Sequence, residues 1–211
     1  MRLIRLITLL SLTALLFGLP ALADTYTIFS QPSQPYYILS TVNYGGGDGS
    51  LNNVSMLGPF MFGYALTEAS VPASWATWNC PPATESCTPN ILYASGKGLT
   101  VGLQPTYNTA GFELEPSPFS VETFSASFFN QYGSVIATIT RDVNGSAGAL
   151  LFALQDDTPG MYITAITITG PSDFAIAELR AGNSIPEPGT LALLGTGLLG
   201  AVTVLRRKLN L

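Results

Sequence analysis

The chain has 211 residues, of which 47% are hydrophobic and 10% are charged, with a net charge of −5 and no histidine. The absence of histidine excludes the Ser-His and Cys-His catalytic pairs and removes the commonest zinc ligand. Residues 24–184 contain twelve acidic and three basic side chains, so their net charge is 3 − 12 = −9. Such a surface repels phosphate groups, which argues against nucleic acid as a partner.

Residues 1–23 contain the three parts of a secretory signal peptide. Arg2 and Arg5 precede a leucine-rich stretch over residues 6–17, and Ala21-Leu22-Ala23 follows. This order matches a basic n-region, an apolar h-region and an A-x-A cleavage site. The alternative is an uncleaved anchor or a core helix, but the apolar stretch is too short to span a bilayer comfortably. We predict cleavage after Ala23.

Residues 24–184 predict one all-β domain, a two-sheet antiparallel sandwich of jelly-roll type. Residues 135–140 and 162–169 alternate threonine with apolar residues, which is the period of a half-buried strand. Further strands are expected at 26–29, 36–42, 59–66, 99–103, 123–129, 148–154 and 174–179. Turns rich in Gly, Asp and Pro are expected at 45–49, 142–145, 156–160 and 170–173.

The only cysteines of the chain are Cys80 and Cys87, seven positions apart. In an exported chain the simplest interpretation is one disulfide that closes a short loop, with free thiols or a redox pair as alternatives. On chain-entropy grounds this crosslink would contribute about 2 to 3 kcal/mol. Its role would be to hold one surface loop.

Trp75 and Trp78 are the only tryptophans and lie just before that loop. Aromatic rings on a loop can stack on the faces of sugars, whereas large aromatic side chains more often pack into a core. Both interpretations stay open, and these two residues are the first candidates for a sugar contact.

Two groups of residues with carboxyl or amide oxygens are candidates for a catalytic or metal site. Glu113 and Glu115 lie two apart in an expected strand, so their carboxyls face the same side, and such a pair can act as acid and base in a glycosidase. We interpret them as the polar face of a solvated strand and predict no catalytic residue. In the expected turns, side-chain oxygens that could bind calcium belong to Asp142, Asn144, Asp156 and Asp157. Such residues also form turns without a metal, so we predict no metal and no cofactor.

The C-terminal segment 185–211 combines Pro186-Glu187-Pro188, an uncharged apolar run over about 190–205, and a basic cluster of Arg206, Arg207 and Lys208. Sixteen helical residues reach about 24 Å, which is marginal for a hydrocarbon core of about 30 Å. The apolar side chains point all round a helix, which favours a transmembrane helix over a soluble amphipathic one. The basic cluster would stay on the cytoplasmic side.

Residues 185–207 closely resemble the PEP-CTERM protein-sorting domain, also catalogued as the ice-binding protein C-terminal domain. The resemblance implies recognition by an exosortase, a membrane enzyme that cleaves near the Pro-Glu-Pro and passes the protein outward. It implies transient contact with the inner membrane, then a place at the cell surface or in the extracellular matrix. Nothing about ice follows, because proteins of many kinds share this tail.

Residues 111–180 resemble the sandwich domains that precede such tails, which are similar to the jelly rolls of carbohydrate-binding modules and lectins. The closing strand of those domains often carries adjacent aspartates, where this chain has Ala177-Glu178. The resemblance therefore implies the fold more than a ligand.

Together these observations predict a non-enzymatic exported protein with a structural or adhesive role in an exopolysaccharide matrix. A lectin-like carbohydrate-binding module that contacts exopolysaccharide is the alternative, and a glycosidase is a more distant one.

Overall fold

The computed structural model describes residues 25–33, 36, 39–41, 54–104 and 106–183. The expected signal peptide 1–23, the glycine-rich turn 45–49 and the sorting segment 185–211 with its expected membrane helix lie outside these ranges. The described residues contain no helix with the length and hydropathy of a membrane span.

The elements of the described residues are β-strands, which confirms the prediction of an all-β antiparallel fold. In chain order they are β1 (Tyr26–Phe29), β2 (Ser40–Thr41), β3 (Val54–Leu57), β4 (Phe60–Ser70), β5 (Asn90–Ala94), β6 (Gly98–Leu103), β7 (Thr109–Pro116), β8 (Val121–Asn130), β9 (Val135–Asn144), β10 (Leu150–Asp156), β11 (Ile163–Thr169) and β12 (Phe174–Gly182).

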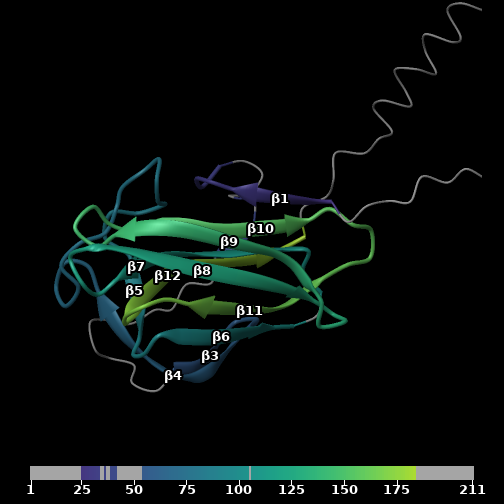
Figure 1. The fold of residues 1–211 in the computed structure, drawn as a ribbon, viewed down its shortest axis with the longest axis horizontal. Helices are drawn as coiled ribbons and strands as arrows, with labels where there is room; N and C mark the ends of the chain where they lie inside the picture. Colours follow the sequence, from purple (N-terminus) through teal and green to yellow (C-terminus); the bar gives the residue numbers. More distant parts are fainter. Residues whose placement is uncertain (1–24, 34–35, 37–38, 42–53, 105, 184–211) are drawn as a thin grey trace, which may run out of the picture.

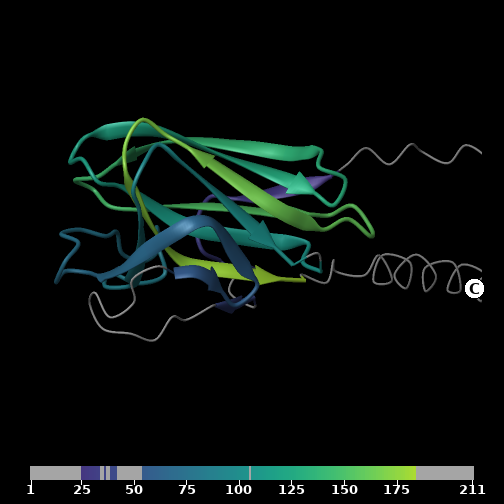
Figure 2. The same cartoon turned by 90° about the horizontal axis from the view of Figure 1, so that it is seen from below.

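The strands form two layers that share β4 (Figures 1 and 2). The first layer, here called the β7 sheet, has the order β1-β10-β7-β12-β5-β4, with β2 beside β12. The second layer, the β8 sheet, has the order β4-β6-β11-β8-β9, with β3 beside β4. Phe60 to Phe62 of β4 pair with β6, whereas Thr67 to Ser70 pair with β5. This long strand therefore joins the layers into one near-barrel.

The main core lies between the two layers. Phe112 of β7 stacks on Phe152 of β10 with ring centroids 5.8 Å apart, and Phe124 of β8 meets Phe174 of β12 edge-on at 5.5 Å. All four rings are at most 1% exposed. Burying one such side chain stabilises the fold by about 1.5 to 3 kcal/mol, so these rings hold the layers together.

The outer face of the β8 sheet carries rows of hydroxyl groups. Ser125 hydrogen-bonds Thr140 at 2.9 Å, and Ser127 hydrogen-bonds Thr138 at 2.8 Å. The side chains between them along the strands, such as Ala126 and Phe128, are buried in the core. This alternation is the reason why the sequence predicts β8, β9 and β11 correctly.

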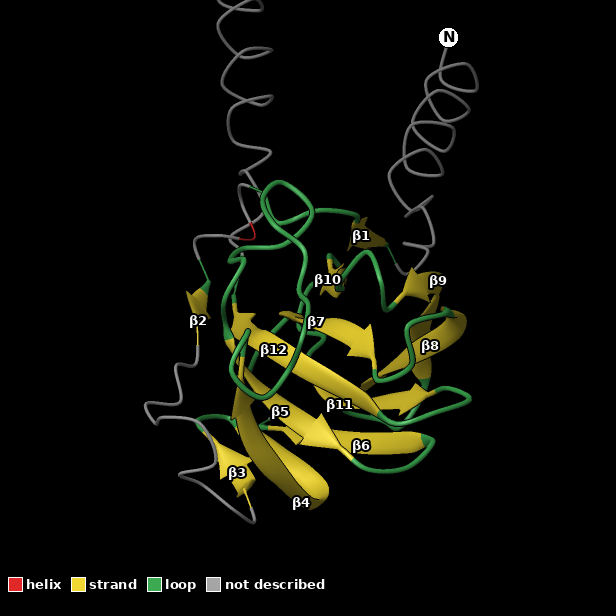
Figure 3. Ribbon diagram, turned by 90° about the vertical axis from the view of Figure 1, so that its left-hand side faces the viewer, coloured by secondary structure: helices red, strands yellow, loops and turns green. Residues whose placement is uncertain are grey.

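The outer face of the β7 sheet is covered instead of exposed. Residues 71–89, called the cover loop below, connect β4 to β5, and Val71 and Trp78 pack on Ala175 and Ala177 of β12 in a second apolar cluster. Tyr36 and Leu39 pack with other residues in a third cluster, against β10. Figure 3 shows loops lying in front of β7 and β12.

Several expected boundaries are wrong. Within the expected strand 36–42, the described residues contain only Ser40–Thr41 as strand. Residues 142–144 continue β9, so the turn begins at Gly145 instead of Asp142. The expected strand 148–154 begins two residues later and extends to Asp156. Strands β3 and β5 were not expected, because each is short and has few alternating positions.

Candidate functional site

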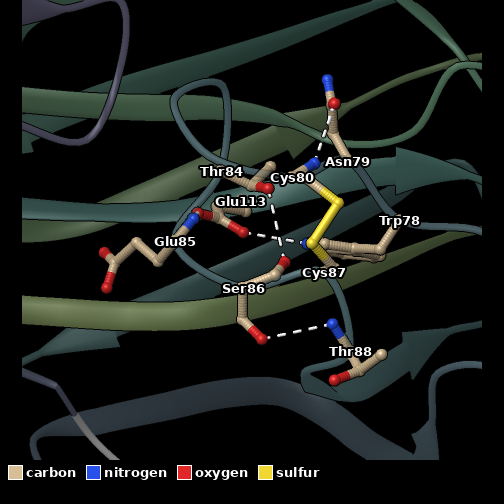
Figure 4. Close-up of a disulfide and its surroundings, with 9 residues drawn as sticks. All are labelled: Trp78, Asn79, Cys80, Thr84, Glu85, Ser86, Cys87, Thr88 and Glu113. Carbon is tan, nitrogen blue, oxygen red and sulfur yellow. Dashed lines mark hydrogen bonds between the residues drawn. A yellow bond between two sulfur atoms is a disulfide. The ribbon is translucent and has the colours of Figure 1, made fainter.

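The cover loop is anchored to the β7 sheet through a buried glutamate. Glu113 of β7 is 0% exposed. The indole N–H of Trp78 donates to its Oε2 at 2.9 Å, and the backbone N–H of Glu85 donates to its Oε1 at 2.6 Å. Figure 4 shows the carboxyl of Glu113 between these two donors. Trp78 is 8% exposed, and its hydrogen bond to Glu113 holds the loop in place.

Burial raises the pKa of Glu113 to about 8, although the hydrogen bonds from Trp78 and Glu85 oppose the shift. The negative charges of Glu178 and Glu85 raise it further. A carboxyl without direct contact to a basic side chain is more stable protonated in such surroundings.

The same loop contains the expected disulfide. Cys80 and Cys87 are bonded, with Cα atoms 4.4 Å apart. Between them, the carboxylate of Glu85 forms a largely buried ion pair with Arg180 of β12. Arg180 Nη1–H also donates to the carbonyl oxygen of Leu39 at 2.5 Å. One arginine therefore ties both covering segments to the sheet.

A small pocket opens where the cover loop passes the end of β7. Its volume is about 190 Å³, and its lining residues are Ser74, Trp75, Ala76, Thr77, Glu115, Ser117 and Phe119. We call it the Glu115 pocket. Trp75 is half-buried, and Phe119 is 64% exposed. Two aromatic side chains and a carboxyl thus share one concave site.

Hydrogen bonds hold the walls of the pocket together. Thr77 of the cover loop lies 3.0 Å from the carbonyl oxygen of Gly145, in the turn between β9 and β10. The hydroxyl of Ser146 in that turn donates to the carbonyl oxygen of Phe119 at 3.0 Å, and the N–H of Gly145 donates to the carbonyl oxygen of Ser120 at 3.1 Å. Because both walls are fixed to one turn, the site is formed in advance of any ligand.

Glu115 is the floor of the pocket. It is 1% exposed, and its Oε1 lies 2.5 Å from the hydroxyl of Thr77. Its Oε2 is buried and has no hydrogen-bond partner. Burial raises the pKa of Glu115 to about 7, whereas the nearby Thr77 hydroxyl and Trp75 indole lower it.

The contact between Glu115 and Thr77 suits both protonation states. When Glu115 is protonated, it can donate to Thr77, whose own hydrogen then points to Gly145. When Glu115 is ionised, it accepts the hydrogen of Thr77. The charge of the floor can therefore change near neutral pH without loss of this contact.

The structure brings four of the sequence candidates together. Trp78 contacts Glu113, and Trp75 lines the same pocket as Glu115. The interpretation of Glu113 and Glu115 as a solvated polar face is wrong, because the cover loop buries both. Glu113 does not line the pocket, so the two carboxyls do not face a common ligand.

Sequence reasoning missed Thr77, Ser117 and Phe119 as parts of this site. The available signal was Ser117-Pro118-Phe119-Ser120, where a large apolar residue stands in a turn-forming segment.

The candidate calcium ligands are occupied by hydrogen bonds within the protein. Asp142 accepts from Thr123 at 2.6 Å, Asn144 accepts from the N–H of Ser146 at 3.0 Å, and Asp156 accepts from the N–H of Thr158 at 2.9 Å. Asp157 accepts from Thr27 at 2.8 Å. Among the residues that the structure describes, no group of three or more His, Cys, Asp or Glu side chains is arranged to hold a metal ion.

Comparison with known proteins identifies the tail. Residues 184–208 match the PEP-CTERM protein-sorting motif. No curated protein sequence matches the chain.

Three solved structures show weak similarity to the chain. The enzymatically active domain of tailspike protein 4 from bacteriophage CBA120 is 16% identical, with a TM-score of 0.35 over 67% of this chain and 21% of that chain. The carbohydrate-binding module TmCBM61, solved with β-1,4-galactotriose, is 10% identical, with a TM-score of 0.37 over 65% of this chain and 92% of that chain. The CBM22-1 xylan-binding domain from Paenibacillus barcinonensis is 6% identical, with a TM-score of 0.33 over 67% of this chain and 100% of that chain. At these values no ligand or activity transfers to this chain.

Proposed function

We propose that the protein is a non-enzymatic component of an extracellular polysaccharide matrix, with a structural or adhesive role. The observation that carries this proposal is the sorting motif at residues 184–208, which is the mark of an exported protein processed by an exosortase. The basic and apolar N-terminal residues support it, because they have the order of a secretory signal. The tail would hold the chain at the inner membrane only until it is cleaved.

The geometry of the two glutamates supports a non-catalytic role. A glycosidase needs two carboxyls on opposite sides of one glycosidic bond. Glu113 is fully buried and accepts two hydrogen bonds from the cover loop, so it serves to anchor that loop. Glu115 is the single carboxyl that lines the pocket.

Intact mass spectrometry of the mature protein from its native host tests the sorting proposal. We expect a chain that begins at Asp24 and ends close to Pro186-Glu187-Pro188, recovered from the matrix fraction. Replacement of these three residues by alanine should leave the precursor uncleaved in the membrane fraction. Pro159→Ala, in an exposed turn of the sandwich, is the control and should be processed normally. A native chain that still runs to Leu211 would mean a permanent membrane anchor instead.

A carbohydrate-binding function is the second candidate, and the Glu115 pocket favours it. The pocket joins the half-buried ring of Trp75, the exposed ring of Phe119 and several hydroxyl groups, a combination that suits a sugar. Binding on a glycan array without turnover would support this function over the glycosidase. Turnover of a bound glycan would contradict both non-enzymatic functions.

A further inference from the structure

We propose that the Glu115 pocket binds one sugar residue that carries a free amino group, as part of a matrix polysaccharide. The inference rests on the carbohydrate-binding function proposed above and names its ligand class. Three properties of the pocket carry it, namely its size, its buried acidic floor and its aromatic walls.

The size limits the ligand to a single ring. Pockets for drug-sized ligands measure roughly 300 to 1,000 Å³. The Glu115 pocket measures about 190 Å³, so it has room for one sugar unit and not for several successive ones. The rest of a polysaccharide would lie over the surface outside the pocket.

The floor selects for positive charge. Glu115 is the one charged residue among those that line the pocket. Its carboxyl is 1% exposed and lies beside the indole of Trp75, so a cation in the pocket would act on it from above and not through direct contact with the buried Oε2. A buried carboxylate is stable when a cation compensates its charge. The protein side of the pocket has a low dielectric constant, which strengthens the attraction of an ammonium group placed above this floor. The net charge of −9 over residues 24–184 also attracts a polymer with amino groups.

The walls favour an organic cation over a metal ion. Trp75 and Phe119 present aromatic rings, and a ring face attracts an ammonium group as well as the apolar face of a sugar. A calcium ion needs six to eight oxygen ligands, whereas Glu115 is the single carboxyl in the lining. Ser74 and Ser117 also line the pocket, and the Ser74 hydroxyl accepts the backbone N–H of Ser70 at 3.1 Å, which fixes this part of the wall.

Three β-1,4-linked hexamers that differ only at carbon 2 of each ring test the proposal. They are the hexamers of glucosamine, with a free amine, of N-acetylglucosamine, with an amide, and of glucose, with a hydroxyl. We would measure their binding to the full-length chain in mild detergent at pH 7 by titration calorimetry. The glucosamine hexamer should bind at least about tenfold more tightly than the other two.

Variants locate the binding. Glu115→Gln should reduce the preference for the amine to about twofold or less, because the ionisable floor is removed. Phe119→Ala should weaken binding about fivefold, and because this residue is 64% exposed the fold should be retained. Trp75→Ala should also weaken binding of the glucosamine hexamer. The control is Asp157→Asn, which also removes one acidic charge but lies at the opposite end of the β7 sheet, and it should change affinity by less than about twofold.

Several results would overturn the proposal. Equal binding of the three hexamers would mean that the pocket takes neutral sugars. Binding that survives both Glu115→Gln and Phe119→Ala would place the site elsewhere. Equal affinity for a lysine hexapeptide, lost in the same variants, would mean that the pocket takes a protein side chain instead of a sugar.

Recovery of the protein in the matrix fraction distinguishes failure of the pocket proposal from failure of the proposed matrix role. If Glu115→Gln abolishes binding to the glucosamine hexamer and also reduces recovery in the matrix fraction, both are supported. If none of the hexamers binds while the wild-type protein is still cleaved and retained in the matrix, the pocket proposal fails and the structural role in the matrix stands.

Discussion

Glu113 links the cover loop to the stability of the whole sheet, because its carboxyl is buried and receives hydrogen bonds from Trp78 and Glu85. Ionisation of this carboxyl is unfavourable, since no basic side chain within the described part of the chain contacts it directly. The fold therefore retains a proton on this side chain that the unfolded chain releases at lower pH.

This proton makes stability depend on pH. The unfolded chain releases it near the ordinary pKa of 4.5, whereas the folded chain releases it at about 8. Between these values the folded state binds more protons, so the free energy of unfolding should fall as the pH rises from about 5 to 8. The shift corresponds to about 3 to 5 kcal/mol. Glu115, with a pKa of about 7, acts in the same direction up to that pH.

Glu113→Gln should flatten this pH dependence in urea unfolding followed by tryptophan fluorescence. The amide cannot ionise, but its NH₂ group cannot accept one of the two hydrogen bonds, so the variant should be less stable at pH 5 by about 1 to 3 kcal/mol. Glu122→Gln, on the partly exposed side of β8, is the control and should keep most of the wild-type slope. An unchanged slope in Glu113→Gln would show that another group is responsible.

At the scale of elements, the turn between β9 and β10 supports the cover loop through a glycine. Gly148 has a φ of +99°, and a Cβ atom there would lie 2.3 Å from the backbone nitrogen of Asn79. Gly160 also has a positive φ, of +78°, but a Cβ atom there would meet nothing within 4 Å. Both glycines have a positive φ, but the cover loop packs closely only against Gly148.

Gly148→Ala should therefore destabilise the protein by at least about 2 kcal/mol more than Gly160→Ala, because only the first substitution pushes the cover loop off the sheet. Urea midpoints compare the two variants, and tryptophan fluorescence reports whether Trp78 becomes exposed. Equal losses in the two variants would mean that the loop does not pack on the turn in this way.

The elements also show what could be predicted from sequence. β8, β9 and β11 have one face in the core and one in water, so threonine and serine alternate with apolar residues and reveal the strands. β7 is buried at all eight positions, and the cover-loop residues that hydrogen-bond its two glutamates precede them in the chain by 28 to 38 positions. No local pattern reports such a contact, so the sequence alone predicts a solvated position for Glu113 and Glu115. The tryptophan pair is a sequence candidate because tryptophan is rare in the chain, whereas its contacts with Glu113 and the Glu115 pocket depend on the tertiary fold.

At the scale of the whole molecule, β4 belongs to both layers, and its two halves pair with β5 and β6. The rings of Phe124 and Phe174 pack across the layers as well. Loss of one sheet would therefore expose the core face of the other and leave half of β4 unpaired. This connection predicts that the two sheets unfold together.

Native-state hydrogen exchange of the full-length chain in mild detergent measures this coupling. The slowest amides of β7, at the centre of one sheet, and of β11, at the centre of the other, should open with free energies that agree within about 1 kcal/mol, and tryptophan fluorescence should show one transition. Exchange in the short edge strand β1 should be faster and is the internal comparison. If β11 opens at a clearly lower free energy than β7, the β8 sheet unfolds by itself and the shared strand does not couple the layers.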